Sequence, residues 1–314
     1  MTRFFVVPQW QGSPAARAMH LADGAEAIAG DLPRAATVRV EVPSSAGESL
    51  DTGIRRFSAL TRVRDALADT LAGALGDATT DAGASPVTTP TTAGDVPTDA
   101  GASPAAGDAA GPAGETPVHD VPIVVGGDCG VAVPAIAHAA ARHERLAVVW
   151  FDAHGDLNAP ESSPSGAFAG MALRAVFDEL PLPGSGPVPA DRVILAGARE
   201  LDDAEVDLIA QRGIRVVDVT ALADASALAE AVAATGAAAL YIHVDLDVLD
   251  PAAITGVALP VPFGLSLDEL VAAIRAARGV APLVGASIAG FAPASAAAAV
   301  DDLGTILRVV GALA

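Results

Sequence analysis

The chain of 314 residues contains no lysine, since all 18 of its basic residues are arginine. A phosphate loop of the GxxxxGK[ST] kind, a Schiff-base enzyme and a pyridoxal enzyme each need a lysine amine, so these three chemistries are excluded. The 38 acidic residues give a formal net charge of −20. Because nucleic-acid affinity depends on Lys and Arg neutralising phosphates, we expect neither nucleic acid nor an anionic membrane as a partner.

Cysteine and long apolar runs are also scarce. The single cysteine, Cys129, has no partner for an internal disulfide, which favours a reducing compartment. The apolar run at 4–8 is too short for a signal peptide, and the uncharged stretch 284–300 is too short and too rich in small residues to span a membrane. We therefore expect a soluble cytoplasmic protein, and 52% hydrophobic residues suffice for a substantial core.

One segment, at about 77–117, has a composition unlike the rest. It consists mainly of Ala, Gly, Thr, Pro, Ser and Asp, and the heptapeptide TDAGASP at 80–86 recurs at 98–104. Such a segment buries too little apolar surface to offset the entropy lost on ordering. We predict a flexible insertion that interrupts a single domain spanning 1–314.

Outside this insertion, short apolar runs alternate with alanine-rich helical stretches. The runs that predict strands are 4–7, 37–42, 123–125, 146–151, 193–195, 216–217, 240–244 and 283–287. The helical stretches include 54–75, 133–143, 204–212, 222–234 and 267–277. Continuous apolar runs are typical of strands covered by helices on both faces. The pattern predicts an α/β protein with a parallel sheet, whose ligands bind beyond the carboxyl ends of the strands.

Three of the predicted strands end in acidic turns, with the sequences GGDCG at 126–130, DAHGDLN at 152–158 and DLDVLDP at 245–251. Residues i and i+2 of an extended strand end share a face, so Asp152, His154 and Asp156 can converge, as can Asp245 and Asp247. A single Asp-x-Asp turn is usually solvated or caps a helix, but two clusters that directly follow buried strands favour a metal centre. Oxygen-rich sites with one or two imidazoles suit Mn²⁺, and two such ions about 3.5–4 Å apart generate a bridging hydroxide at neutral pH.

These motifs resemble those of the arginase/agmatinase/formimidoylglutamase family, the ureohydrolases. The segment 126–128 resembles the family's GGDH strand end, 152–156 its DAHxD and 245–251 its DxDxxDP, and the similarity covers most of the chain outside the insertion. The resemblance implies a three-layer α/β/α fold around a mostly parallel sheet of about eight strands. It also implies a binuclear manganese centre and a homo-oligomer.

The resemblance further implies a role for each residue of the acidic turns. Asp152 and Asp245 would bridge the two metals, His154 and Asp247 would complete one metal site, and Asp156 would belong to the other. A metal-bridging hydroxide would attack the carbon of a small amidino or formimino substrate, with Asp247 accepting its proton and His154 as the second catalytic candidate. Asp250 would brace the turn with Pro251.

Three further residues match positions that hold an amino-acid substrate in the family's arginases. Asn158 and Ser165 fall where the α-carboxylate is bound, and Asp202 falls where an acid faces the α-amino group. Asn and Ser are also common turn formers, so these assignments rest on the resemblance alone.

The sequence departs from the family pattern at three positions. Cys129 replaces the histidine of GGDH; it is either a ligand, which as a thiolate disfavours Mn²⁺ relative to Zn²⁺ or Fe²⁺, or a small buried hydrophobe. Ala169 replaces the histidine that transfers protons in arginases, and Gly290 replaces the glutamate that pairs with a guanidinium. Arginine itself therefore becomes a doubtful substrate.

These departures leave three hypotheses. The leading one is a metal-dependent hydrolase of linear amidines. The second is a catalytically degenerate protein that keeps the fold and metal binding, and the third is a hydrolase in which the Cys129 thiol, activated by a histidine, attacks the substrate. His243, two residues before Asp245, could point toward the metals or lie beneath them, although a core position is favoured.

Overall fold

The computed structural model describes residues 2–76 and 120–314, and its eight strands form one sheet in the order β2-β1-β3-β8-β7-β4-β5-β6. Every pair of neighbouring strands is parallel. The strands are β1 (Thr2–Val7), β2 (Thr37–Arg39), β3 (Val121–Gly126), β4 (Leu146–Phe151), β5 (Val193–Ala196), β6 (Arg215–Val217), β7 (Ala239–Asp245) and β8 (Leu283–Ala289). The predicted parallel α/β sheet is confirmed, whereas the predicted insertion lies outside the described residues.

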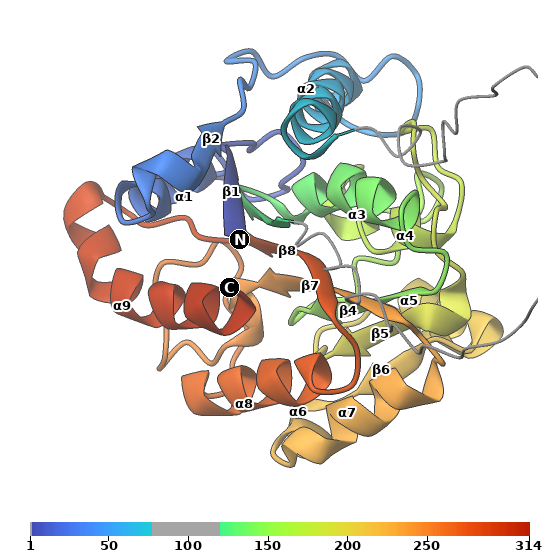
Figure 1. Cartoon of the computed structure of the whole chain (residues 1–314). Helices are drawn as coiled ribbons and strands as arrows, with labels where there is room; N and C mark the ends of the chain where they lie inside the picture. The colour runs from blue at the N-terminus through green and yellow to red at the C-terminus, as the bar shows by residue number, and fades with distance from the viewer. Residues whose placement is uncertain (1, 77–119) are drawn as a thin grey trace, which may run out of the picture.

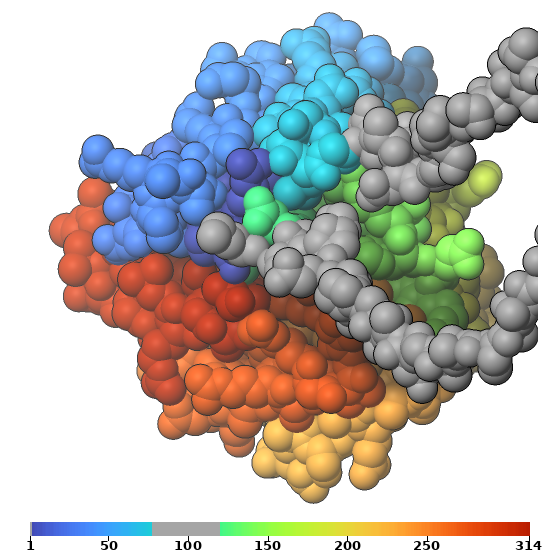
Figure 2. Space-filling model, in the orientation of Figure 1, coloured from blue at the N-terminus to red at the C-terminus, as the bar shows by residue number. Residues whose placement is uncertain are grey.

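Helices cover both faces of the sheet, which makes the fold a three-layer α/β/α sandwich (Figure 1). One face carries α2 (Phe57–Leu75), α3 (Ala132–Ala140), α4 (Arg174–Phe177) and α5 (Asp203–Arg212). The other carries α1 (His20–Gly30), α6 (Val219–Leu222), α7 (Ala225–Ala234), α8 (Leu267–Arg278) and α9 (Ala296–Leu313). In the space-filling view, α1 in blue lies beside α9 in red, although the two are at opposite ends of the chain (Figure 2). In the described part of the chain, none of these helices has the length and apolarity needed to cross a bilayer.

The helix predicted at 222–234 is observed as α7, which begins at Ala225, whereas Leu222 ends the separate short helix α6. Asp218 accepts a hydrogen bond from the Ala221 amide at the start of α6, and Asp224 accepts one from the Ser226 amide at the start of α7. Each aspartate therefore caps its own helix N-terminus, and the second cap interrupts what the apolar pattern alone would continue.

The apolar runs have the burial that their composition predicts. All six residues of β4 are buried, and its side chains alternate between the two cores, with Trp150 on the α2–α5 face and Phe151 on the other. Burying one such large apolar side chain stabilises the fold by about 1.5–3 kcal/mol. A strand with both faces covered has no polar positions, which explains why the sequence shows runs instead of alternation.

The strand order brings the acidic turns together. Strands β3, β8, β7 and β4 are consecutive neighbours in the sheet, and the three acidic turns follow β3, β7 and β4. Because all strands are parallel, their carboxyl ends lie on one edge, where Gly290 follows β8.

Candidate metal centre

A cavity of about 280 Å³ opens at this edge of the sheet. All six predicted metal ligands line it: Cys129, Asp152, His154, Asp156, Asp245 and Asp247. Five of them are nearly inaccessible to solvent, and His154 is half-buried. Residues from three separate segments of the chain therefore converge in one cavity, as the strand-end pattern predicts.

The first group of donor atoms surrounds His154. Its Nδ1 lies 3.3 Å from Asp152 Oδ1 and 3.1 Å from Asp247 Oδ2. Backbone amides orient the two carboxylates, because the His154 amide donates to Asp152 Oδ1 and the Ala153 amide donates to Asp247 Oδ1. One atom from each of the three side chains lies within 4.8 Å of the others, a spacing at which they could share one metal ion.

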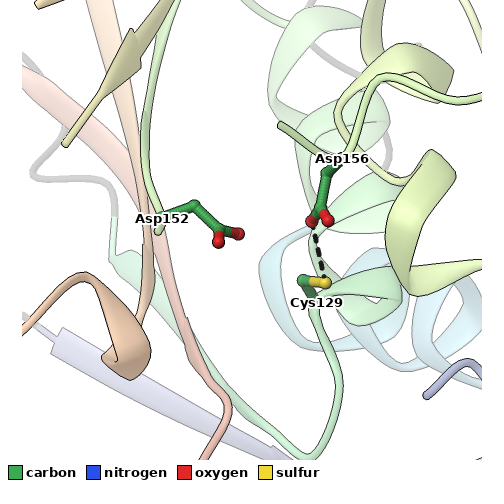
Figure 3. A group of neighbouring side chains, drawn as sticks. All are labelled: Cys129, Asp152 and Asp156. Atoms are coloured by element: carbon green, nitrogen blue, oxygen red, sulfur yellow. Dashed lines mark hydrogen bonds between the residues drawn. The ribbon is translucent and has the colours of Figure 1, made fainter. Parts of the chain in front are cut away.

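The second group combines Cys129, Asp152 and Asp156. Asp152 and Asp156 direct their carboxylates toward the same space, and the Cys129 thiol lies against Asp156 (Figure 3). The thiol donates a hydrogen bond of 3.0 Å to Asp156 Oδ2. Asp156 has a positive φ of 54°, a conformation that aspartate tolerates better than most residues and that turns its side chain back toward β3.

A third group consists of Asp152, Asp245 and His243. Asp245 is the last residue of β7, and its Oδ1 accepts a hydrogen bond from the Asp247 amide. His243 lies on the same face of β7, is fully buried, and stacks against Trp150 with 3.8 Å between ring centroids. Its place in the core agrees with the favoured sequence interpretation, and it also adjoins two of the predicted ligands.

Burial and mutual repulsion disfavour the ionised form of the carboxyl groups when no cation is present. Burial, together with the charge of Asp152, raises the pKa of Asp156 well above its usual value, and burial with the charge of Asp247 does the same for Asp245. Burial alone would lower the pKa of His154, but its bonds to Asp152 and Asp247 outweigh this effect and raise the pKa to about 12. The cluster thus places four carboxyl groups beside one imidazolium, and a divalent cation would favour the ionised form of those carboxyl groups.

The donor chemistry fits metal ions, though not equally in the two proposed sites. Imidazole nitrogen and carboxylate oxygens, as offered by His154, Asp152 and Asp247, suit Mn²⁺. A site that includes Cys129 needs a thiolate and suits the softer Zn²⁺ or Fe²⁺ better. Burial, followed by the charge of Asp156, raises the pKa of the Cys129 thiol, so a metal would have to displace its proton.

The same environment argues against Cys129 as a nucleophile. Its sulfur donates to the Asp156 carboxylate and the Ala169 carbonyl, and neither is the histidine that this hypothesis requires. Reactive cysteines have lowered pKa values, whereas the pKa of this thiol is raised.

Arg199 holds the turn that carries Asp247. Its guanidinium donates to the backbone carbonyls of Asp247 at 2.8 Å, Val261 at 2.7 Å and Pro262 at 3.0 Å, with longer bonds to further carbonyls. Asp250 accepts hydrogen bonds from the Ala252 and Gly264 amides and so braces the same turn, the structural role expected of it.

The two remaining departures from the family pattern also lie at the cavity. Ala169 and Gly290 both line it and offer no titratable group. Gly290 has a φ of +89°, and a Cβ placed there would lie 2.1 Å from Asp245 Oδ1. This backbone therefore accommodates glycine and not glutamate, because the Asp245 carboxylate occupies the space where the side chain would begin.

Two of the three residues predicted to bind substrate line the cavity, and the third does not. Asn158 and Asp202 line the cavity, and Asn158 Nδ2 donates a hydrogen bond of 2.8 Å to Asp202 Oδ2. Ser165 is exposed and is not among the lining residues. The serine that contacts Asn158 is Ser162, whose hydroxyl donates to Asn158 Oδ1 at 2.7 Å.

Sequence reasoning missed Glu205, another acid of the cavity wall. Glu205 is buried; its Oε1 accepts from the Leu157 amide and its Oε2 from the Asp202 amide. Asp202 accepts in return from the Glu205 amide, which completes a capping box at the start of α5. The D-x-x-E spacing was the signal that could have identified this pair.

Asp128, to which the sequence motifs assign no role, shapes the turn before Cys129. Its buried carboxylate accepts hydrogen bonds from the Gln9 side chain and from the Gly12 and Gly130 amides. These bonds tie the turn after β3 to the loop after β1 and thereby fix the position of Cys129.

Comparison with known proteins agrees with this geometry. The family model described as "Arginase family" matches residues 59–306. The chain belongs to the arginase family. The arginase of Bacillus caldovelox is 36% identical over 159 residues, which are 47% of this chain and 53% of that relative. The chain thus spans about half the length of the curated relatives it matches.

Solved structures of the arginase family share the fold over nearly the whole chain. The Entamoeba histolytica arginase, solved in complex with L-ornithine, has a TM-score of 0.75 at 20% identity, covering 99% of this chain and 97% of that one. The formimidoylglutamase of Bacillus subtilis has a TM-score of 0.68 at 15% identity, covering 99% and 86%. At these identities the likeness establishes the three-layer fold.

Proposed function

We propose that this arginase-family chain is a metal-dependent hydrolase of linear amidines, compounds with a guanidino or formimino group. The observation that carries the proposal is the convergence of Asp152, His154, Asp156, Asp245 and Asp247 on one cavity, with donor atoms spaced for metal binding. His154, Asp152, Asp245 and Asp247 would hold one ion, and Asp156, Cys129, Asp152 and Asp245 the other. When bound, such a pair of ions lowers the pKa of water and stabilises negative charge on the reacting oxygen atoms.

The chain's own residues would act on proton position and substrate orientation. Asp247 lines the cavity, its Oδ2 lies 3.1 Å from His154 Nδ1, and it would accept a proton from the attacking water. Asn158 and Asp202 form a polar wall suited to the charged end of a small substrate. In the overall reaction the oxygen of water bonds to the amidine carbon, one C–N bond breaks, and the departing nitrogen takes up a proton.

Gly290 bears on which amidine is accepted. The cavity wall has no carboxylate at this position to pair with a guanidinium through two hydrogen bonds. We therefore propose a formimino compound, or a guanidino compound other than arginine, as substrate. We also propose that the chain forms a homo-oligomer and acts in the cytoplasm.

The second candidate, a metal-binding family member without turnover, is favoured by Ala169, since an alanine at the cavity cannot transfer a proton. Loss of a positioned acid or base typically costs 10²–10⁴-fold in rate, on the order of what separates a working enzyme from an inactive one.

The test uses the full chain, stripped with a chelator and reloaded with Mn²⁺, Zn²⁺ or Fe²⁺. Bound metal is quantified by mass spectrometry, and release of urea, ammonia or formamide is followed over a panel of guanidino and formimino compounds. We expect metal-dependent turnover that falls about 10²-fold or more in Asp247→Asn and is unchanged in Asp207→Asn, the same change at an exposed position of α5.

Two outcomes would contradict the leading proposal. Tight metal binding without turnover on any substrate would establish the second candidate instead. Failure to bind any of the three metals would refute both.

A further inference from the structure

Two buried aromatic rings in contact with each other adjoin the Asp152 and Asp245 carboxylates of the cavity. Trp150 on β4 and His243 on β7 are opposite each other in the sheet register, and their centroids are 3.8 Å apart. Asp152 and Asp245 follow these two residues at i+2, so each carboxylate lies on the same side of its strand as one ring. Trp150 Nε1 donates a hydrogen bond of 3.1 Å to Asp152 Oδ2. The indole thus has a partner within the cluster.

The imidazole of His243 uses only one of its two nitrogens. Nδ1 lies 2.7 Å from the hydroxyl of Ser287, the residue opposite it on β8. Nε2 is buried and has no hydrogen-bond partner. Leaving a buried polar atom unpaired is unfavourable, so the unused nitrogen of a ring that adjoins two carboxylates indicates a missing binding partner.

The position of the ring identifies the class of that partner. One nitrogen of His243 and one carboxylate oxygen each from Asp152 and Asp245 all lie within 4.8 Å of one another. Because Ser287 engages Nδ1, Nε2 is the nitrogen left to bind. Imidazoles that ligate metals almost always have their other nitrogen held by a hydrogen-bond partner, the role that Ser287 has here.

We propose that His243 is a metal ligand in this chain, and that its Nε2 binds, together with Asp152 and Asp245, a divalent transition-metal ion on the sheet side of these two carboxylates. The inference rests on the proposed function, because it adds an imidazole ligand to the metal centre in which Asp152 and Asp245 would bind both ions. Asp152 then lies between two imidazoles, His154 toward the cavity mouth and His243 toward the sheet. An imidazole in the ligand set favours Zn²⁺ or Fe²⁺ over Mg²⁺ or Ca²⁺.

The direct test is the proton NMR spectrum of the full chain loaded with Co²⁺. A metal-bound imidazole gives a strongly shifted, solvent-exchangeable N–H signal, so wild type should show two such signals. His154→Phe should remove one of them, and His243→Phe, which keeps an aromatic ring against Trp150, should remove the other. Ser287→Ala retains the His243 ring and should move its signal without abolishing it.

Metal affinity provides the second readout, measured by competition with a Zn²⁺ chelator. His243→Phe should weaken Zn²⁺ binding by at least about tenfold, the lower end of what the loss of a residue that merely supports a ligand causes. His20→Phe, at a histidine whose partner is Asp23 on α1, is the matched control and should bind as wild type does.

The outcomes separate this inference from the proposed function. A wild-type spectrum with one shifted N–H, lost in His154→Phe, would overturn the role of His243 while leaving the metal site intact. Failure of wild type to bind Co²⁺ and Zn²⁺ would overturn both. Because the wild-type spectrum alone decides the number of imidazole ligands, the test holds even if His243→Phe does not fold.

Discussion

Replacing Arg199 by alanine should destabilise the fold through the turn that carries Asp247. The three shortest bonds of the guanidinium, at 2.7, 2.8 and 3.0 Å, go to the backbone carbonyls of Val261, Asp247 and Pro262, and so join two segments of the chain. A hydrogen bond to a charged group contributes about 1.5–3 kcal/mol when buried, and we take about 1 kcal/mol for each because the side chain is half-exposed. Arg199→Ala should therefore lower the free energy of unfolding by about 3 kcal/mol.

The measurement is equilibrium unfolding in urea, with chelator present so that metal binding does not contribute. In a chain of 314 residues a loss of about 3 kcal/mol corresponds to a fall of about 4–6 °C in Tm. Arg199→Lys should recover part of the lost stability, because an ammonium can reach some of the carbonyls but cannot reproduce the planar arrangement of the guanidinium N–H donors. The control is Arg192→Ala, which removes a single solvent-exposed hydrogen bond to the Glu144 carbonyl and should change stability by less than about 0.5 kcal/mol. A loss below about 1 kcal/mol in Arg199→Ala, with an unchanged m-value, would refute the assigned role.

Three further predictions concern the cavity itself. Gly290→Ala should destabilise the chain by about 1–3 kcal/mol in the same urea assay, because φ is +89° and the new Cβ would collide with Asp245; an unchanged midpoint would contradict this. Cys129→His should raise Mn²⁺ affinity relative to Zn²⁺ in calorimetric titrations, and unchanged selectivity would mean that the thiol only packs. Without metal the pKa of His154 is about 12, so it stays protonated from pH 6 to 9 and an incoming metal must displace that proton. Affinity should therefore rise with pH, by about tenfold per pH unit for each proton released, and calorimetry in two buffers of different ionisation enthalpy should detect the release; a pH-independent affinity would count against it.

Most of the fold could be predicted from the sequence because each central strand is a continuous apolar run. The run at 146–151 coincides with β4, and the runs at 123–125 and 240–244 lie inside β3 and β7. The length of the edge strand β2 was predicted less accurately, because a strand was predicted at 37–42 whereas β2 ends at Arg39. Val40 still donates its amide to the Val6 carbonyl, but the strand has no neighbour on its other side to extend the ladder.

The acidic cluster was also predictable, because strand ends and i, i+2 spacing determine where its side chains lie. What could not be predicted depends on how the fold and the loops place side chains. The partner of His243 is Ser287, 44 residues away, and the partner of Asn158 is Ser162. Ser165, which was predicted to bind substrate, is exposed. Loop conformation decides such pairs, and no periodicity in the sequence encodes it.

The capping box of α5 has a consequence for how the cavity could change in evolution or engineering. Asp202 and Glu205 line the cavity, and the same carboxylates satisfy the first amides of the helix. A substitution that retunes the wall for a new substrate therefore removes a helix cap, at about 0.5–2 kcal/mol. Changes of specificity at this wall should accordingly require a compensating stabilising substitution elsewhere, whereas Ala258 and Leu259 on the opposite loop can vary without that penalty.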